Sequence, residues 1–241
     1  MGAEIKSLIR KSDNRELMWQ ADPTFWGRTS PVLFPVVGCY FERQSIYKGK
    51  TYEMGQHGFA RDMDFTLMAS DVASLTFELA DDETMYFSIG AHPAFNCDLD
   101  KDYLKFEKNG KTISELTANI IANDGSGCLS DAQDHYQLEN GILKMSDELF
   151  AKDALVVEKH QADSVTILDE NRNPIIKVTC PTPLFGVWSP TGKHAPFVCI
   201  EPWYGRCDRV GFSKRLEERE YGNELAAGAT FEVAYEIEAA I

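Results

Sequence analysis

Short runs of alternating apolar and polar residues recur along this chain and predict β-strands. The clearest run covers residues 231–238, where Phe231, Val233, Tyr235 and Ile237 fall on one face of an extended segment. Similar runs predict strands at residues 74–79, 85–89, 103–107, 164–168 and 175–179. Such alternation is typical of antiparallel sheets that bury one face and leave the other in water.

Turn-forming residues separate these runs. Asn109-Gly110 and Asn140-Gly141 tolerate positive φ, and residues 169–174 join two β-branched runs as a hairpin loop would. Helical signals are few: Asp22-Pro23 begins a short turn through Trp26, and residues 213–221 form a charged, weakly helical stretch.

No internal repeat, low-complexity tract or linker divides the chain. We therefore expect a single domain over residues 1–241, because all-β folds of this length commonly form one unit. The expected fold class is all-β, a large antiparallel β-sandwich with few short helices. One concave, solvent-open sheet of such a sandwich can hold a ligand.

Charge narrows the classes of partner. With 24 Lys and Arg against 38 Asp and Glu, the formal net charge is −14, which repels nucleic acid and anionic membrane surfaces. The expected partner is a neutral small molecule. The six cysteines show no CxxC spacing and are interpreted as reduced core thiols. No signal peptide or membrane-spanning stretch is recognisable, so we expect a cytoplasmic protein.

Four motifs carry side chains that suit chemistry. They are WGRTSPVLFP (residues 26–35), GQHGFARD (55–62), GAHPAFN (90–96) and CIEPWYG (199–205). In the second motif, glycines let the backbone curl close to a bound group and present His57. His92 follows a strand directly and is therefore rigidly aimed, although a lone histidine there is more often structural. Glu201 lies among apolar and aromatic residues, which tends to raise the pKa of a carboxylate.

Together these motifs resemble the aldose 1-epimerase (galactose mutarotase-like) family, specifically its LacX-type branch, over nearly the whole chain. The resemblance implies the galactose mutarotase-like supersandwich and an enzyme that interconverts the α and β anomers of a hexose. It also implies His92 as general acid and Glu201 as general base. His57 and Arg28 resemble contacts to sugar hydroxyls, and Asp153, in a looser motif, resembles a further ligand-binding carboxylate.

Ring opening of a hemiacetal explains why such residues are wanted. A carboxylate takes the proton of the anomeric hydroxyl while an imidazolium protonates the ring oxygen, and reclosure reverses both transfers. No cofactor is needed. Among Trp26, Phe95, Trp188 and Trp203, we expect one or two to lie against the C–H face of the sugar, and Phe95 and Trp203 are the preferred candidates.

Two departures from the family pattern bear on assembly. The chain opens at Met1 without the initial strand pair usual in the family, and residues 75–87 join two stretches that relatives separate by further strands. Strands lost near Ala80–Glu83 would expose a sheet edge and favour a homodimer.

Other readings are weaker or remain open. No nucleophile elbow or phosphate-binding loop occurs, and the five histidines are scattered without metal-ligand spacing, so no metal is expected. Two alternatives stay open: a hexose-phosphate 1-epimerase in which Arg61 or another base contacts the phosphate, and a carbohydrate-binding protein without turnover.

Overall fold

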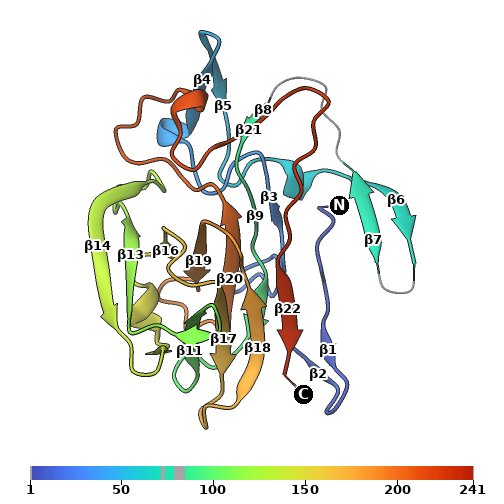
Figure 1. Cartoon of the computed structure of the whole chain (residues 1–241), viewed down its shortest axis with the longest axis vertical. Coiled ribbons are helices and arrows are strands. Elements are labelled where there is room, and N and C mark those ends of the chain that lie inside the picture. Colours follow the sequence, from blue (N-terminus) through green and yellow to red (C-terminus); the bar gives the residue numbers. More distant parts are fainter. Residues whose placement is uncertain (1, 72–73, 79–84, 241) are drawn as a thin grey trace.

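Two large antiparallel sheets form the body of the molecule in the computed structural model, which describes residues 2–71, 74–78 and 85–240 (Figure 1). The strand order of the eight-stranded sheet is β14, β13, β16, β19, β20, β9, β3, with β10 beside β20. Its strands are β14 (Leu129–Gln137), β13 (Glu115–Ile121), β16 (Leu155–Val157), β19 (Leu184–Trp188), β20 (Phe197–Tyr204), β9 (Ile89–Ala91), β3 (Val32–Leu33) and β10 (Ala94–Asn96).

The six-stranded sheet has the order β12, β11, β17, β18, β22, with β15 beside β11. Its strands are β12 (Lys111–Thr112), β11 (Tyr103–Lys108), β17 (Ser164–Leu168), β18 (Pro174–Thr179), β22 (Glu236–Ala239) and β15 (Ile142–Lys144). The predicted all-β class with large antiparallel sheets is confirmed.

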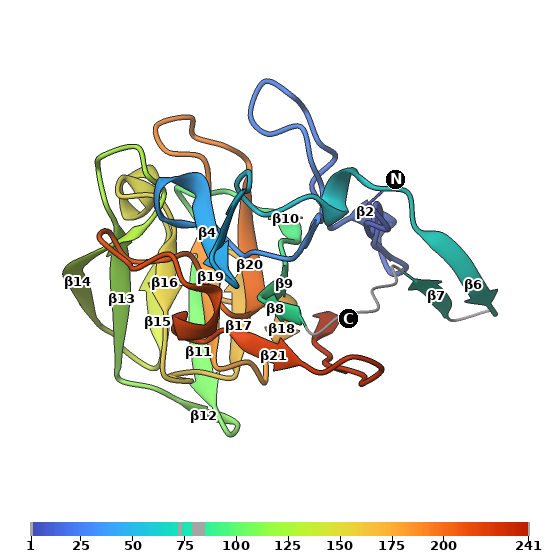
Figure 2. The same ribbon diagram turned by 90° about the horizontal axis from the view of Figure 1, so that it is seen from above.

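Smaller elements surround the two sheets. Four two-stranded ribbons pair β1 (Ile9–Arg10) with β2 (Arg15–Glu16), β4 (Gln44–Tyr47) with β5 (Lys50–Glu53), β6 (Thr66–Ser70) with β7 (Leu75–Glu78), and β8 (Met85–Phe87) with β21 (Asn223–Leu225). The β6–β7 hairpin stands away from the body (Figure 2). The described helices are short 3-10 turns, η1 (Phe41–Arg43), η2 (Ala60–Asp62), η3 (Asp147–Phe150) and η4 (Leu216–Glu218), and none could span a membrane.

The main hydrophobic core fills the space between the two large sheets. Phe106 of β11, Ile167 of β17 and Val178 of β18 meet Phe185 of β19 and Ile200 of β20 there, all buried. Burial of apolar area at roughly 25 cal/mol per Å² makes this layer the main source of stability. The six cysteines are all buried and free, as expected.

Strand β20 is buried on both of its faces. Val198 and Ile200 point into the main core, whereas Cys199, Glu201 and Trp203 alternate with them and point to the opposite side of the sheet. That opposite side carries two further apolar clusters, so Glu201 lies in a protein interior rather than on a wet sheet face.

Most predicted strands are confirmed within a residue or two, and the run at 85–89 is divided between β8 and the start of β9. The exception is residues 231–238, which form a strand only from Glu236. The partner strand β18 ends at Thr179, which pairs with Glu236, so the earlier residues have no strand beside them. Phe231 packs instead on the rings of Phe87 and Tyr204, with centroids 5.1 and 5.8 Å apart.

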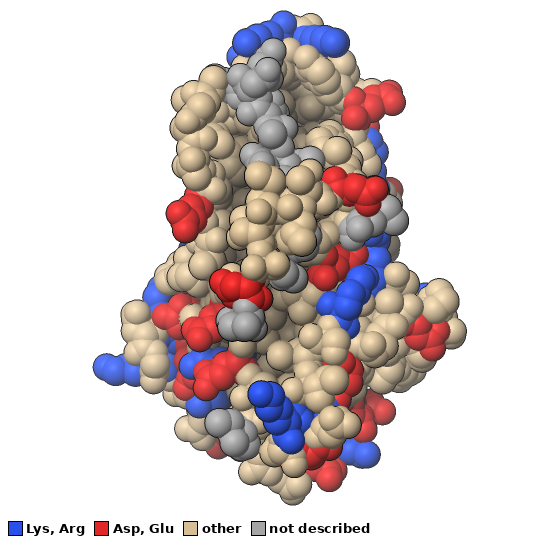
Figure 3. All heavy atoms as spheres, turned by 90° about the vertical axis from the view of Figure 1, so that its right-hand side faces the viewer, with Lys and Arg blue, Asp and Glu red and all other residues tan. Residues whose placement is uncertain are grey.

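The predicted turns are confirmed, with Asn109 and Asn140 at φ 52° and 55° and the Asp169 side chain closing the β17–β18 loop. Residues 79–84, where the sequence suggests that strands of the family are absent, lie outside the described residues. Acidic and basic side chains are mixed over the lower part of the face in Figure 3, so the net charge of −14 does not gather into one acidic patch there.

Candidate active site

A cavity of about 360 Å³ lies on the outer side of the eight-stranded sheet, away from the main core. Strands β13, β16, β19 and β20 form part of its wall, together with loops around Trp26, Gly38, His57 and Asp153. The polar or titratable side chains that line it are Gln56, His57, Arg61, His92, Asp153, Glu201 and Cys207, and three tryptophans accompany them, Trp26, Trp188 and Trp203.

Strand register brings His92 to Glu201. Strands β9 and β10 both pair with β20, with Gly90 opposite Trp203 and Ala94 opposite Cys199. His92 lies between these two pairs and therefore faces Glu201 on the same side of the sheet. Pro93 follows it and has no N–H to donate, which accounts for the break between β9 and β10.

The two side chains are in contact and almost completely enclosed. His92 Nε2 lies 3.3 Å from Glu201 Oε1, and the side chains are 8% and 2% exposed. The Trp26 indole stacks on the imidazole with ring centroids 4.8 Å apart, and Trp188 packs against it edge-on at 5.5 Å. Packing therefore holds the histidine in one orientation.

Burial shifts the protonation of both groups toward their neutral forms. It raises the pKa of Glu201 well above its ordinary value, a rise that the Asp153 carboxylate increases. Burial also holds the pKa of His92 well below its ordinary value, and His57 lowers it further. Both shifts therefore favour the neutral imidazole and the protonated carboxyl group over the ion pair.

His57 is fixed by two hydrogen bonds to one residue. Its backbone N–H donates to Gly38 O at 2.7 Å, and the Gly38 N–H donates to His57 Nδ1 at 3.1 Å. Because Nδ1 accepts, the proton of the neutral ring is on Nε2, which can donate to a ligand. Burial, with Arg61, Arg28 and Arg43 adding to it, lowers the pKa of His57 to about 3.

Glycine is required beside His57. Both His57 and Gly58 have positive φ, 63° and 68°. A side chain at position 58 would place its Cβ 2.2 Å from the carbonyl oxygen of Phe34. Glycine at position 58 therefore lets the chain pass close to the backbone of Phe34 and holds the turn that carries His57.

Four buried polar atoms around the cavity have no hydrogen-bond partner. They are Arg61 Nε, His92 Nδ1, Glu201 Oε2 and Trp203 Nε1, and all four residues line the cavity. An unpaired buried polar group costs about 1–3 kcal/mol, so such a cluster indicates that a polar ligand completes the bonding.

Two glycines make room for Trp203. A Cβ at Gly186 would lie 2.4 Å from the indole Cζ2, and one at Gly90 would lie 2.6 Å from Cδ1. Trp203 is registered beside Gly90 and Leu184, so the indole lies along the sheet over both glycines. This position gives the cavity a flat aromatic wall.

Two residues proposed from the sequence for sugar contact lie elsewhere. Phe95 is 1% exposed and packs in the main core, because it follows Ala94 on β10 and strand alternation turns it to the inner side. Arg28 does not line the cavity and instead donates to Asp62 at 2.6 Å, partly exposed. Phe95 is therefore not a sugar contact, and Arg28 lies outside the set of side chains that line the cavity.

Asp153, His57 and Trp203, which were predicted from the sequence to contact the sugar, line the cavity. Arg61 also lines it, although the sequence reading named it only as a phosphate contact. Gln56 was missed altogether. Its position directly before His57 in a glycine-flanked turn is the signal that could have identified it.

Cys199 adds a third potential ligand atom next to the histidine and the glutamate. One donor atom each from His92, Cys199 and Glu201 lies within 4.8 Å of the others, and all three residues are buried. From the sequence no metal is expected because the histidines are scattered, but the sheet brings His92, from the segment between β9 and β10, to two potential donors on β20.

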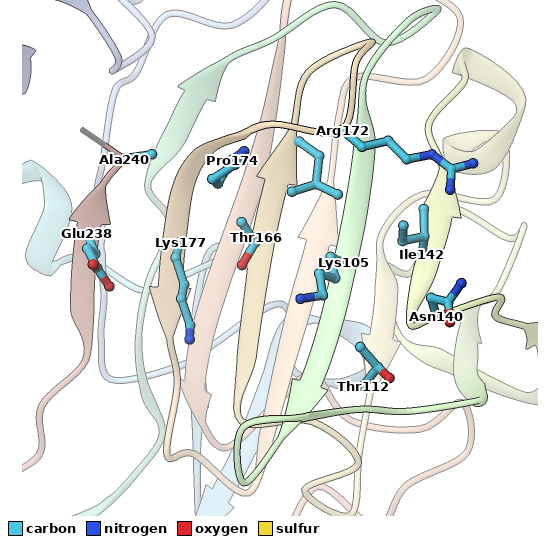
Figure 4. Close-up of a pocket in the computed structure, with 11 residues that line it drawn as sticks. Lys105, Thr112, Asn140, Ile142, Thr166, Arg172, Pro174, Lys177, Glu238 and Ala240 are labelled. Carbon is cyan, nitrogen blue, oxygen red and sulfur yellow. The ribbon is translucent and has the colours of Figure 1, made fainter.

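A larger hollow of about 740 Å³ lies on the outer face of the six-stranded sheet, where Lys105, Thr166 and Lys177 project from β11, β17 and β18 (Figure 4). Lys105 and Lys177 both lie near Glu107, at 2.7 and 3.7 Å. The unpaired buried atoms lie around the other cavity, so we place the candidate active site there.

Comparisons with known proteins identify relatives that span nearly the whole chain. The plasmid-encoded protein LacX of Lactococcus lactis subsp. lactis is 28% identical over 282 residues, covering 98% of this chain and 93% of LacX. That span exceeds the 241 residues here, so LacX has positions without a counterpart in this chain. No family model matches the chain.

Solved structures are similar along the whole chain. The galactose mutarotase related enzyme of Lactobacillus acidophilus is 30% identical with a TM-score of 0.89, covering 100% of this chain and 92% of that one. A galactose mutarotase-like protein of Lactobacillus casei is 27% identical with a TM-score of 0.84, covering 98% and 94%. On the strength of these matches, this chain belongs to the galactose mutarotase-like, or aldose 1-epimerase, family.

Proposed function

We propose that this protein is an aldose 1-epimerase that interconverts the α and β anomers of a hexose, with Glu201 as general base and His92 as general acid. The observation that carries the proposal is the 3.3 Å contact between His92 Nε2 and Glu201 Oε1 inside a cavity whose buried polar atoms lack partners. The anomeric hydroxyl and the ring oxygen of an aldose are bonded to the same carbon. Two groups that must reach both oxygens therefore have to lie side by side.

The protonation states available to Glu201 and His92 suit a reaction that runs in both directions. Ring opening starts with a carboxylate and an imidazolium and ends with a carboxyl group and a neutral imidazole. These two arrangements differ by one proton shift between Glu201 Oε1 and His92 Nε2 when the cavity holds no sugar. Burial favours the neutral arrangement, which is the one that accompanies the open aldehyde.

The remaining wall residues are proposed to hold the sugar. His57 Nε2–H and the Arg61 guanidinium donate, Asp153 accepts, and the Trp203 indole contributes its face and its unpaired N–H. The open aldehyde must turn about its C1–C2 bond while the other sugar hydroxyls stay bound. These contacts therefore keep the open-chain sugar in the cavity until the ring closes again.

Polarimetry of freshly dissolved α-glucose and α-galactose tests the proposal. The wild type should accelerate the approach to anomeric equilibrium, and Glu201→Gln or His92→Asn should lower kcat by about 10²–10⁴-fold. Matched controls are Glu238→Gln on β22 and His135→Asn on β14, both exposed and outside the cavity. Wild-type activity in the two site variants would contradict the assigned roles.

One observation favours a phosphorylated or otherwise anionic hexose as a second candidate substrate. Arg61 lines the cavity with a buried Nε that makes no hydrogen bond, although it lies 3.7 Å from Asp62, and its charge together with that of Arg28 lowers the pKa of both site histidines. An anionic substrate predicts a KM that rises with salt, whereas a neutral sugar predicts a KM nearly independent of salt. The same assay with hexose 6-phosphates distinguishes the two, and binding without acceleration of any sugar would point to a carbohydrate-binding protein.

A further inference from the structure

Cys199 has no part in the proposed proton transfers, yet it lies directly against the groups that perform them. It is fully buried on β20, two residues before Glu201 and on the same side of the strand. Across the sheet, Ala94 faces Cys199 while His92 lies at the position opposite Glu201. The thiol, the carboxyl group and the imidazole thus form a triangle whose donor atoms all lie within 4.8 Å of one another.

We propose that a thiophilic divalent cation of the zinc type binds between His92, Cys199 and Glu201 and reversibly blocks the cavity. Imidazole nitrogen, thiolate sulfur and carboxylate oxygen are the three ligand types that Zn²⁺ takes in proteins, usually in a tetrahedral arrangement. Donor atoms of such a site lie roughly 3.5 Å apart, so side-chain shifts of about 1 Å complete it. The cavity supplies the fourth position, for a water molecule or a sugar hydroxyl.

Charge balance supports a divalent cation at this depth. One thiolate, one carboxylate and one neutral imidazole neutralise a charge of +2, so the filled site carries no net charge in a low-dielectric interior. Binding replaces the proton of the Cys199 thiol, and that of Glu201 where the carboxyl group is protonated. Up to two protons therefore leave for each M²⁺ that enters, with no change in oxidation state.

Unpaired polar atoms of His92 and Glu201 also support a cation site. Glu201 Oε2 and His92 Nδ1 are buried without hydrogen-bond partners, so both side chains have unused bonding capacity. Trp26 and Trp188 pack against the imidazole and keep it facing Glu201. A cation here would occupy lone pairs that the proposed acid and base need, so its effect on turnover, unlike its binding, rests on the proposed function.

Spectroscopy with Co²⁺ tests the site without any turnover. Co²⁺ added to the wild type should produce a thiolate-to-cobalt charge-transfer band in the near ultraviolet and tetrahedral ligand-field bands, which Zn²⁺ should remove. Cys199→Ala should lose the band and bind Co²⁺ more than about 100-fold more weakly. Cys180→Ala, which removes an equally buried thiol after the end of β18, should keep it. A wild type without the band, or a Cys199→Ala variant that keeps it, would overturn the proposal.

A second measurement covers a Cys199 variant that does not fold. Zinc-edge X-ray absorption of the wild type loaded with one Zn²⁺ should show one sulfur neighbour at about 2.3 Å, and a shell of nitrogen and oxygen alone would refute the site. In the mutarotation assay, Zn²⁺ should inhibit the wild type and Cys180→Ala but not Cys199→Ala. If no sugar is turned over, the spectra still decide the cation site, so the two proposals fail separately.

Discussion

Nε2 of His92 lies 3.3 Å from Oε1 of Glu201 because the two residues occupy facing register positions on β20 and on the segment between β9 and β10. The sheet holds both backbones in place, and Trp26 stacks on the imidazole and keeps it facing Glu201. The two groups are therefore expected to act as one unit.

The double variant Glu201→Gln, His92→Asn should be scarcely slower than the worse of the two single variants. Each single change already disables the coupled transfer, so the effects of the two changes on kcat should not multiply. Steady-state polarimetry of the four proteins gives the comparison. Losses that multiply would show that the two residues act independently.

Glu201→Gln should make the protein more resistant to heat at pH 8. Burial raises the pKa of Glu201 above its ordinary value of 4.5, so ionising it costs more in the folded than in the unfolded protein. This cost is absent below pH 4.5, where both states are protonated, and grows as the pH rises toward the folded-state pKa. Each kcal/mol recovered should raise Tm by about 2–4 °C at pH 8, with the gain shrinking toward pH 4. Thermal melts against Glu238→Gln test this, and a gain independent of pH would contradict it.

The imidazole of His57 should stay neutral between pH 5 and 8. Its pKa of about 3 lies below that range, so its NMR shifts should not titrate there. The unfolded chain binds a proton near pH 6.5 that the folded chain does not, so this residue makes the protein less stable as the pH falls from 6.5 toward 3. His57→Asn should remove that part of the acid sensitivity. A titration of the His57 signal near pH 6.5 would show that the ring is not enclosed as described.

Arg61→Gln should raise KM about tenfold or more, while Arg28→Gln should change it far less. Arg61 lines the cavity and its Nε makes no hydrogen bond, with Asp62 Oδ2 3.7 Å away, whereas Arg28 donates to Asp62 and does not line the cavity. Loss of a charged hydrogen bond to a substrate costs about 1.5–3 kcal/mol. Steady-state kinetics on the preferred sugar compares the KM values of the two variants. Equal increases in KM would show that Arg28 contacts the substrate as Arg61 does.

Gly186→Ala should displace the Trp203 indole. Its new methyl group would lie 2.4 Å from the ring, so we expect a loss of about 1–3 kcal/mol in the free energy of unfolding and weaker sugar binding. Gly55→Ala serves as the control, because its added Cβ meets nothing within 4 Å. Denaturant unfolding and tryptophan fluorescence with added sugar measure both effects. Unchanged fluorescence in Gly186→Ala would show that the indole does not lie on that glycine.

The local signals in the sequence predicted the strands well where a partner strand exists. Residues 164–168 and 175–179 have β-branched alternation and an Asp-led loop between them, and they pair as β17 and β18. The equally regular run at 231–238 is strand only from Glu236, because alternation reports which side chains share a face and not whether a neighbouring strand is present.

The sequence by itself determined the all-β class, the turns at Asn109 and Asn140, and the set of motifs that contain His57, His92 and Glu201, since these depend on local backbone preferences and residue type. Only the tertiary structure decided which motif residues meet. Strand alternation turned Phe95 into the core, an ion pair held Arg28 outside the cavity, and register placed Cys199 beside His92 and Glu201. Register between distant strands depends on how whole sheets pack, which no local stretch of sequence encodes.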